Sequence, residues 1–166
     1  MRATHGKPAL RLVHAAPEVG AEWDWFCGRC AARPAATGAP APSARVCSSC
    51  GLGVLLETPR DAAPQPGDAF LIVDATLSVQ AMSQTAERLL GIEEDLALHR
   101  PVTQLLVQAD SEAGGARSFA DALTGALVGD GPTSSFVRPW NTFGIHLRAR
   151  IARCGPPPAA LLVLEA

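Results

Sequence analysis

The sequence predicts an α+β protein in which a small cysteine-rich module precedes an antiparallel sheet with helices on one face. Three observations lead to this prediction. Two Cys-x-x-Cys pairs lie between residues 23 and 56. After residue 66 the expected elements are two strands, several helices and three strands, an order typical of an antiparallel sheet with its helices on one side. Proline and glycine crowd the first 66 residues, whereas periodic apolar patterns follow them.

Composition and charge narrow the class of protein. Of the 166 residues, 48% are hydrophobic and 18% are charged, which is typical of a globular chain. Residues 1–66 carry seven basic and five acidic side chains, and residues 67–166 carry seven and eleven. Neither part has the dense basic patch expected of a protein held on nucleic acid. No stretch has the pattern of a secretion signal or the length of a membrane span, so we expect a cytoplasmic protein.

The chain divides into four regions. Residues 1–22 have no clear period, although Leu10, Leu12 and Val13 favour a short strand. Residues 23–56 contain both cysteine pairs. Residues 57–66 are polar and contain proline, which indicates a linker. Residues 67–166 hold nearly all the periodic pattern and form the second domain.

The second domain begins with two strands and a set of helices. Ser83 is a good helix N-cap, and Gly91 a good stop. Ser118 with Asp121 resembles a capping box for a longer helix that ends near Gly129, after a loop at residues 110–117. The expected early elements are strands at Phe70–Val73 and Leu77–Met82, a helix from Ser83 to Gly91, a further helical turn at residues 92–98 and a short helix at Thr103–Val107.

Three strands are expected to close the domain, at about Thr133–Arg138, Phe143–Arg153 and Ala159–Glu165. In the middle strand, apolar residues from Phe143 to Ile151 alternate with polar or small ones. A period of two predicts one buried and one solvated face.

The four cysteines Cys27, Cys30, Cys47 and Cys50 predict a metal site. Two Cys-x-x-Cys turns separated by sixteen residues have the spacing of zinc sites, because each turn aims two thiolates at one ion. Four thiolates leave no open position, which predicts structural Zn²⁺. Iron, and two unrelated thiol pairs, are the alternatives. Gly51 suits a tight turn after the second pair, whereas Ala31 predicts a less regular first turn.

Residues 23–56 resemble a zinc ribbon, in the runs Trp25–Cys30 and Val46–Gly51. The resemblance implies a metal site but no single function. Two interpretations of the neighbouring side chains are open. Trp23 and Trp25 either stack on bases or cover a small core, and the arginines either contact phosphate or lie solvated; the second interpretation is preferred. The arginines concerned are Arg29, Arg33 and Arg45.

Residues 67–166 resemble a PAS domain. The resemblance is carried by Ala69–Ala75, by Leu77–Met82 with Ser83–Gly91, by Arg100–Leu106 and by the three closing strands. It implies a five-stranded antiparallel sheet with helices over one face, sometimes a bound ligand, and often a dimer. No cysteine lies around Arg100, where flavin-binding members carry one. His99 is the only histidine in the helical half and is interpreted as a surface residue, as is His146, so no organic cofactor is predicted.

Ten apolar residues are expected to line the core of this domain or a pocket within it. If they fill the interior, the domain docks proteins; if they leave a cavity, it binds a small apolar ligand. We favour the filled core. The ten are Ile72, Leu89, Leu90, Leu105, Phe119, Leu123, Leu127, Phe136, Ile145 and Leu147.

No group of residues predicts catalysis, because no histidine adjoins a nucleophile and no glycine-rich phosphate loop is present. The acidic run Glu93–Asp95 is interpreted as a solvated helix start, and Cys154 as a spare thiol in a hairpin turn. We therefore expect a non-enzymatic signalling or regulatory protein with a protein partner, which could be a second copy. The alternatives are a nucleic-acid-binding ribbon and a flavin or haem sensor. Replacing Cys47 is expected to unfold residues 23–56 and to leave the second domain folded.

Overall fold

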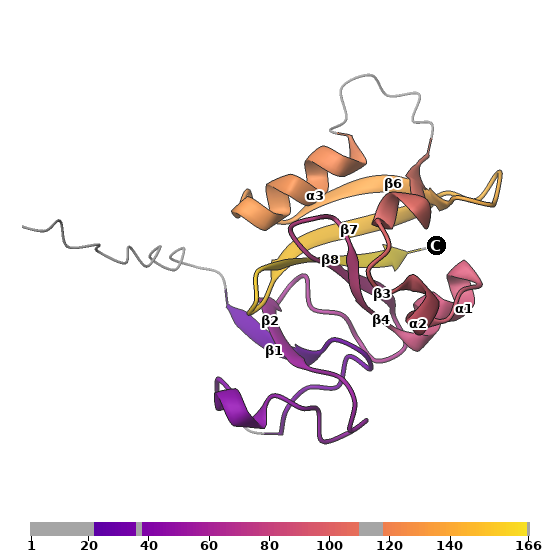
Figure 1. Cartoon of the computed structure of the whole chain (residues 1–166). Coiled ribbons are helices and arrows are strands. Elements are labelled where there is room, and N and C mark those ends of the chain that lie inside the picture. Colours follow the sequence, from indigo (N-terminus) through magenta and orange to yellow (C-terminus); the bar gives the residue numbers. More distant parts are fainter. Residues whose placement is uncertain (1–21, 36–37, 110–117, 166) are drawn as a thin grey trace, which may run out of the picture.

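The computed structural model of the chain describes residues 22–35, 38–109 and 118–165. In them β1 (Trp23–Cys27) and β2 (Leu55–Pro59) form a small antiparallel sheet (Figure 1). A larger antiparallel sheet has the strand order β4-β3-β8-β7-β6-β5. Its strands are β3 (Ala69–Val73), β4 (Val79–Met82), β5 (Leu106–Gln108), β6 (Thr133–Pro139), β7 (Leu147–Cys154) and β8 (Ala159–Glu165). We call residues 23–59 the ribbon and residues 69–165 the sheet domain.

The helices are α1 (Gln84–Leu90), α2 (Glu94–Ala97) and α3 (Phe119–Val128), with 3-10 turns at Pro42–Ala44 and Val102–Gln104. The predicted caps are confirmed. The Ser83 hydroxyl accepts a hydrogen bond from the Ala86 amide, and Ser118 accepts one from the Asp121 amide. Gly91 and Gly129 end the two helices in the left-handed conformation that glycine favours. None of the described helices is long and apolar enough to cross a membrane.

The predicted α+β class is confirmed, but the sheet has six strands where five were predicted. The additional strand is β5, where a short helix at Thr103–Val107 was predicted. That prediction holds only at its start, where a 3-10 turn covers Val102–Gln104. Leu106–Gln108 pairs with β6 instead, and this pairing decides the local conformation. The predicted strand at residues 10–13 and the loop at residues 110–117 lie outside the described residues.

The helices and one face of the sheet enclose the helix-facing core. It is one continuous cluster of buried side chains drawn from all six strands of the larger sheet and all three helices. Val73, Leu123, Ile151 and Leu162 have no measurable exposure or nearly none. This packing accounts for the strand alternation in β7, where Leu147, Ala149 and Ile151 face the helices.

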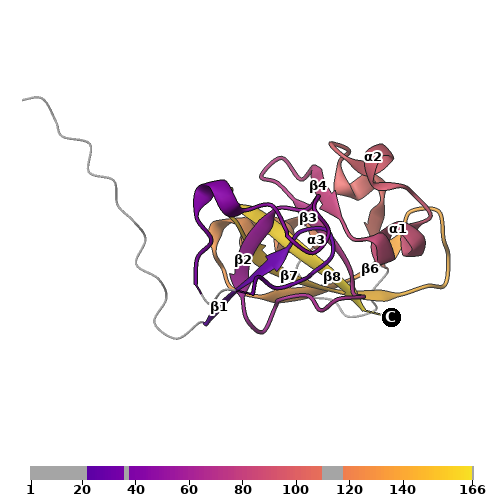
Figure 2. The same ribbon diagram turned by 90° about the horizontal axis from the view of Figure 1, so that it is seen from below.

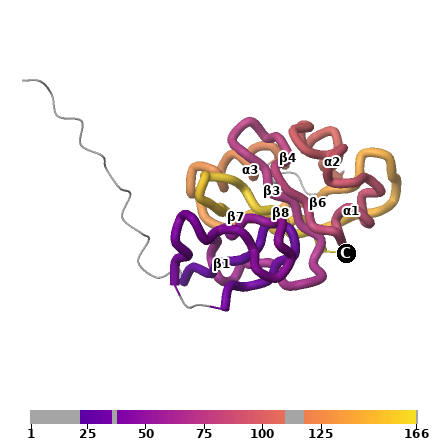
Figure 3. Tube along the Cα trace, turned by 60° about the horizontal axis from the view of Figure 1, so that its bottom comes forward, coloured from indigo at the N-terminus to yellow at the C-terminus, as the bar shows by residue number. Residues whose placement is uncertain are grey.

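The ribbon covers the opposite face of the same sheet. Figures 2 and 3 show it lying against β7 and β8, on the side away from α3. The Phe26 ring of β1 meets the Phe70 ring of β3 edge-on, with centroids 6.1 Å apart, and both rings are buried. We call this second cluster the back-face cluster; its members are Phe26, Ala31, Leu56, Phe70, Ile72, Cys154, Ala159, Leu161 and Val163. The two modules therefore share a core.

Backbone and side-chain hydrogen bonds also join the ribbon to β7. The amides and carbonyls of Glu57 and Gly155 bond reciprocally, at 2.6 and 2.9 Å. The Thr58 hydroxyl, fully buried, donates to the Arg153 carbonyl at 2.8 Å. Residues 57–59, predicted as the start of a linker, complete β2, and Ala62 and Ala63 after them are buried. The connection between the modules is therefore packed against the protein.

The ten predicted core residues divide into three groups. Leu90, Leu105, Phe119, Leu123 and Leu147 are buried in the helix-facing core, and Leu127 packs partly against it. Ile72 is buried too, but in the back-face cluster. Leu89, Phe136 and Ile145 are exposed, so their prediction as core residues was wrong.

The error at Ile145 has a structural cause. The strand predicted to begin at Phe143 begins at Leu147, and the residues before it form an exposed hairpin loop in which Gly144 has a φ of 77°. The alternating pattern continues into this loop, but no other element covers it.

Candidate metal centre

The structure brings the four predicted ligands together. Cys27 ends β1, Cys30 lies in the turn that follows, and Cys47 and Cys50 lie in a second turn closed by a bridge between Val46 and Val54. The sulfur atoms of Cys27 and Cys50 are 3.7 Å apart, and those of Cys30 and Cys47 are 3.8 Å apart. All four sulfurs lie within 4.8 Å of one another, so they could hold a metal ion.

The spacing of the sulfurs fits a tetrahedral metal–thiolate site. Zinc–sulfur bonds of about 2.3 Å place the corners of a tetrahedron about 3.8 Å apart. The two measured separations match this value. Four thiolates would complete the coordination of the ion and leave no position for a substrate.

The two cysteine turns have the same backbone conformation. The amide of Ala31 donates to the Cys27 carbonyl at 3.0 Å, and that of Gly51 donates to the Cys47 carbonyl at 2.9 Å. Ala31 and Gly51 have φ values of 59° and 69°. The prediction of a less regular first turn was therefore wrong. Alanine costs about 1–2 kcal/mol in this conformation, but its methyl group is buried in the back-face cluster.

Backbone amides and burial shift the pKa of the cysteine thiols in opposite directions. Burial raises the pKa of Cys27 to about 12, against the amides of Cys30 and Arg29, which lower it. The amides of Gly53 and Leu52 lower the pKa of the more exposed Cys50 to about 6. Amides also bond the sulfurs directly, from Arg29 to Cys27 and from Gly53 to Cys50, both at 3.4 Å. Such amides stabilise thiolates, the form in which cysteine binds a metal.

Gly53 is part of the site, although it was not among the predicted site residues. A Cβ atom at this position would lie 2.2 Å from the Cys27 sulfur and 2.9 Å from Cβ of Arg29. No side chain fits there without displacing a ligand. A glycine three residues after the last cysteine is the only signal that could have indicated this constraint.

The first cysteine turn is tied to the helices of the sheet domain. Arg29, between the first two cysteines, forms an ion pair with Glu94 of α2. The other oxygen of Glu94 accepts a hydrogen bond from the Met82 amide of β4 at 3.0 Å. The interpretation of Glu94 as a solvated residue was wrong, because its side chain is only 15% exposed and spans two elements.

The other residues selected from the sequence lie outside the metal centre. The Arg45 guanidinium stacks over Trp25 at 5.6 Å, so this tryptophan covers the small ribbon core. Trp23 is partly exposed. His99 is exposed with a φ of 62°. Cys154 lies at the end of β7 in the back-face cluster, not in a turn, and burial raises its pKa to about 12.

Exposure predicts an order of reaction for the cysteines. In brief alkylation of the native, metal-loaded protein, Cys50 should be modified before Cys27 and Cys154, because its side chain is partly exposed. Cys27 and Cys154 are buried and should react only after unfolding. Peptide mapping by mass spectrometry gives the order. Modification of Cys154 in folded protein before Cys50 would contradict this reasoning.

Comparisons with known proteins show similarity of fold. No protein-family model and no curated protein matches the chain. The PAS domain of nitrogen regulation protein NR(II) from Vibrio parahaemolyticus is similar at 15% identity and a TM-score of 0.44, over 60% of this chain and 88% of that one. A PAS domain from Colwellia psychrerythraea has 17% identity and a TM-score of 0.41, over 60% and 85%.

A third similar structure is the E. coli DhaR(N)–DhaL complex, with 16% identity and a TM-score of 0.41, over 60% of this chain and 32% of that one. The structures similar to this chain thus include PAS domains, the fold that the sequence of residues 67–166 resembles. These similarities concern the fold alone.

Proposed function

We propose that the chain is a non-enzymatic regulatory protein that docks a protein partner on its sheet domain, and that its ribbon holds one structural zinc ion. The observation that carries the docking function is the continuous packing of the helix-facing core. The side chains that would surround an internal ligand instead contact one another. A domain with a filled interior acts through its surface.

Zinc is the ion that best suits the four cysteines. Zinc and iron both accept four thiolates in a tetrahedron. Zinc has no redox chemistry, and the partly exposed positions of Cys30 and Cys50 would open an iron site to oxidation. Metal thiolates of this kind persist in reducing compartments, which supports a cytoplasmic location.

The ribbon is less suited to nucleic acid, because three of the four arginines in it or next to it, all but Arg45, have acidic partners. Arg29 pairs with Glu94, Arg33 with Asp24, and Arg60 with Glu22. Phosphate contacts would have to compete with these carboxylates. A haem or flavin sensor has as little support, because His99 is exposed and does not face the helix-facing core.

Native mass spectrometry of the purified chain tests this proposal. The expected mass is that of the polypeptide plus one zinc ion, with no organic molecule retained, and metal analysis should give about one zinc per chain. A retained organic ligand, or a visible absorption band in protein that contains no iron, would favour a ligand sensor. One iron per chain would overturn the assignment of the metal but not the docking function.

A further inference from the structure

A cluster of large apolar side chains is exposed where β6 and β7 meet their connecting hairpin. Phe136 is 55% exposed, Trp140 61%, Phe143 86% and Ile145 46%. We call these four residues, with Arg138 and Arg148, the hairpin surface. Single exposed apolar residues are ordinary, but a group of three aromatic rings and an isoleucine on one hairpin is typical of an interaction site.

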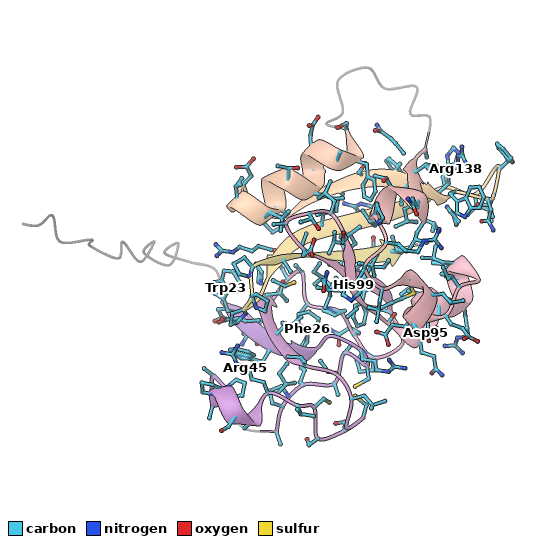
Figure 4. All side chains as sticks on the ribbon, in the orientation of Figure 1. Trp23, Phe26, Arg45, Asp95, His99 and Arg138 are labelled. Carbon is cyan, nitrogen blue, oxygen red and sulfur yellow. The ribbon has the colours of Figure 1, made fainter. Side chains whose placement is uncertain are left out.

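Strand alternation places Phe136 and Arg138 on the back face of the sheet, beyond the ribbon. Val137 points into the helix-facing core, so its neighbours Phe136 and Arg138 point to the opposite side. Trp140 continues the alternation. The hairpin projects from the end of the sheet in Figure 1, and Figure 4 shows Arg138 there, far from Phe26 under the ribbon. The ribbon thus covers part of this face and leaves Phe136 uncovered.

The charge of the hairpin surface is positive. Residues 133–154 contain four arginines and no aspartate or glutamate, in a chain whose net charge is −2. Arg138 stacks over Phe143 at 5.0 Å and donates to the Thr142 carbonyl at 2.8 Å, which holds the hairpin in place. Arg148 lies opposite Phe136 in the β6–β7 register, so a cation adjoins the apolar group on each side.

A hollow of about 380 Å³ continues the surface toward the ribbon. Arg148 and Arg150 line it, together with Asp61, Pro132 and Ser134. Glu165 lies 2.6 Å from Arg150 and 4.0 Å from Arg148, so one carboxylate serves two guanidinium groups. Arg148 therefore has capacity for a further carboxylate.

We propose that the hairpin surface docks an acidic, amphipathic segment of a partner protein. The inference rests on the docking function proposed above and specifies its site and the chemistry of the partner. Apolar side chains of the segment cover Phe136, Trp140 and Phe143. Its carboxylates meet Arg138 and Arg148, and the hollow beside Arg148 receives one of them. Aromatic and arginine side chains are the residues most enriched at the centres of protein interfaces.

Charge also favours an acidic protein segment over two other occupants, a second copy of this chain and single-stranded nucleic acid. In a symmetric pair of chains, Arg138 and Arg148 would face the same arginines, and like charges at an interface oppose association. Single-stranded nucleic acid could stack on the rings, but its affinity depends on the number of phosphates that lysine and arginine side chains neutralise. Three arginines project from this face of β6 and β7, and Arg150 is already paired with Glu165.

A peptide selection tests the proposal on the full, zinc-loaded chain. Displayed random 12-residue peptides are selected on immobilised protein, and the most enriched peptide is then synthesised with a fluorophore for polarisation measurements. We expect the enriched peptides to carry net negative charge together with aromatic or aliphatic residues. The Trp140→Ser/Phe143→Ser double variant and the Arg148→Glu variant should each weaken binding about tenfold or more. Leu96→Ser, at an exposed leucine of α2, is the matched control and should bind as the wild type does.

Each remaining outcome overturns the proposal. If the enriched peptides lack negative charge, the assigned chemistry is wrong. If their binding is unaffected in the variants, the docking function stands but lies on another surface. Failure to enrich any peptide, tight binding of a single-stranded oligonucleotide, or self-association abolished by the double variant would each assign the surface to another role. All the substituted side chains are exposed, so unchanged circular dichroism spectra and melting temperatures will verify folding.

Discussion

The Cys47→Ser variant should lose its metal ion and unfold in both modules, not in the ribbon alone. A serine hydroxyl does not replace a thiolate ligand, and metal binding supplies about 10–16 kcal/mol in small structural zinc modules. The side chains that cluster around the site, such as Leu55 and Trp25, are too few to hold the ribbon without the ion. An unfolded ribbon would uncover Phe70, Ile72 and Leu161 on the sheet.

The newly exposed sheet face explains why the sheet domain should also unfold. Each large apolar side chain that loses its cover costs about 1.5–3 kcal/mol, and a whole domain is stable by only about 5–15 kcal/mol. We expect the melting midpoint to fall by at least about 10 °C, measured by circular dichroism and metal analysis. Ser48→Ala, at an exposed residue of the same turn, is the control and should keep both metal and stability. A metal-free variant with an unchanged sheet domain would restore the sequence-based expectation of two independent modules.

The Phe26→Ala variant should lower the free energy of unfolding by about 3–5 kcal/mol while the protein keeps its zinc. Phe26 is fully buried and belongs to the back-face cluster, whereas Cys27 next to it faces the metal. The substitution therefore removes the contact between the modules without touching a ligand. Urea unfolding, followed by fluorescence and by circular dichroism, measures the loss.

Trp23→Ala is a matched control for Phe26→Ala, because Trp23 is an aromatic residue of the same strand that is 37% exposed. This substitution should lower the free energy of unfolding by much less. If both variants lower it by the same small amount, the contact between Phe26 and Phe70 contributes little to stability. If Phe26→Ala also releases zinc, the metal site depends on the sheet more than its geometry indicates.

Much of the fold follows from local patterns that the sequence displays. The cysteine spacing, the serine caps and the glycine stops each depend on a few neighbouring residues, and the structure confirms them. Phe136 shows where such patterns fail. In β6 alternation allows either Phe136 or Val137 to face the core, and the prediction took the wrong one of the two. Pairing with β5 and β7 decides which side chains of β6 face the core, and these strands lie outside the local sequence pattern.

The sequence contains a pattern that indicates a covered back face, but this pattern was not interpreted in that way. Strands β3 and β8 are continuous apolar runs, Ala69–Val73 and Ala159–Leu164, without the alternation of a sheet that faces water on one side. Such runs indicate strands buried on both faces. The sequence could not say what covered the second face, because the ribbon contributes only a few side chains, of which Phe26 and Leu56 are the largest.

Hydrogen exchange with and without metal tests most directly whether ribbon and sheet form one cooperative unit. The amides of Phe70–Val73 in β3 and Leu161–Val163 in β8 belong to the strands that the ribbon covers. If the account holds, removal of zinc with a chelator will reduce protection at these amides together with that of β1 and β2. If faster exchange is confined to residues 23–59 and the sheet keeps its protection, the ribbon is a separate unit and the central claim is contradicted.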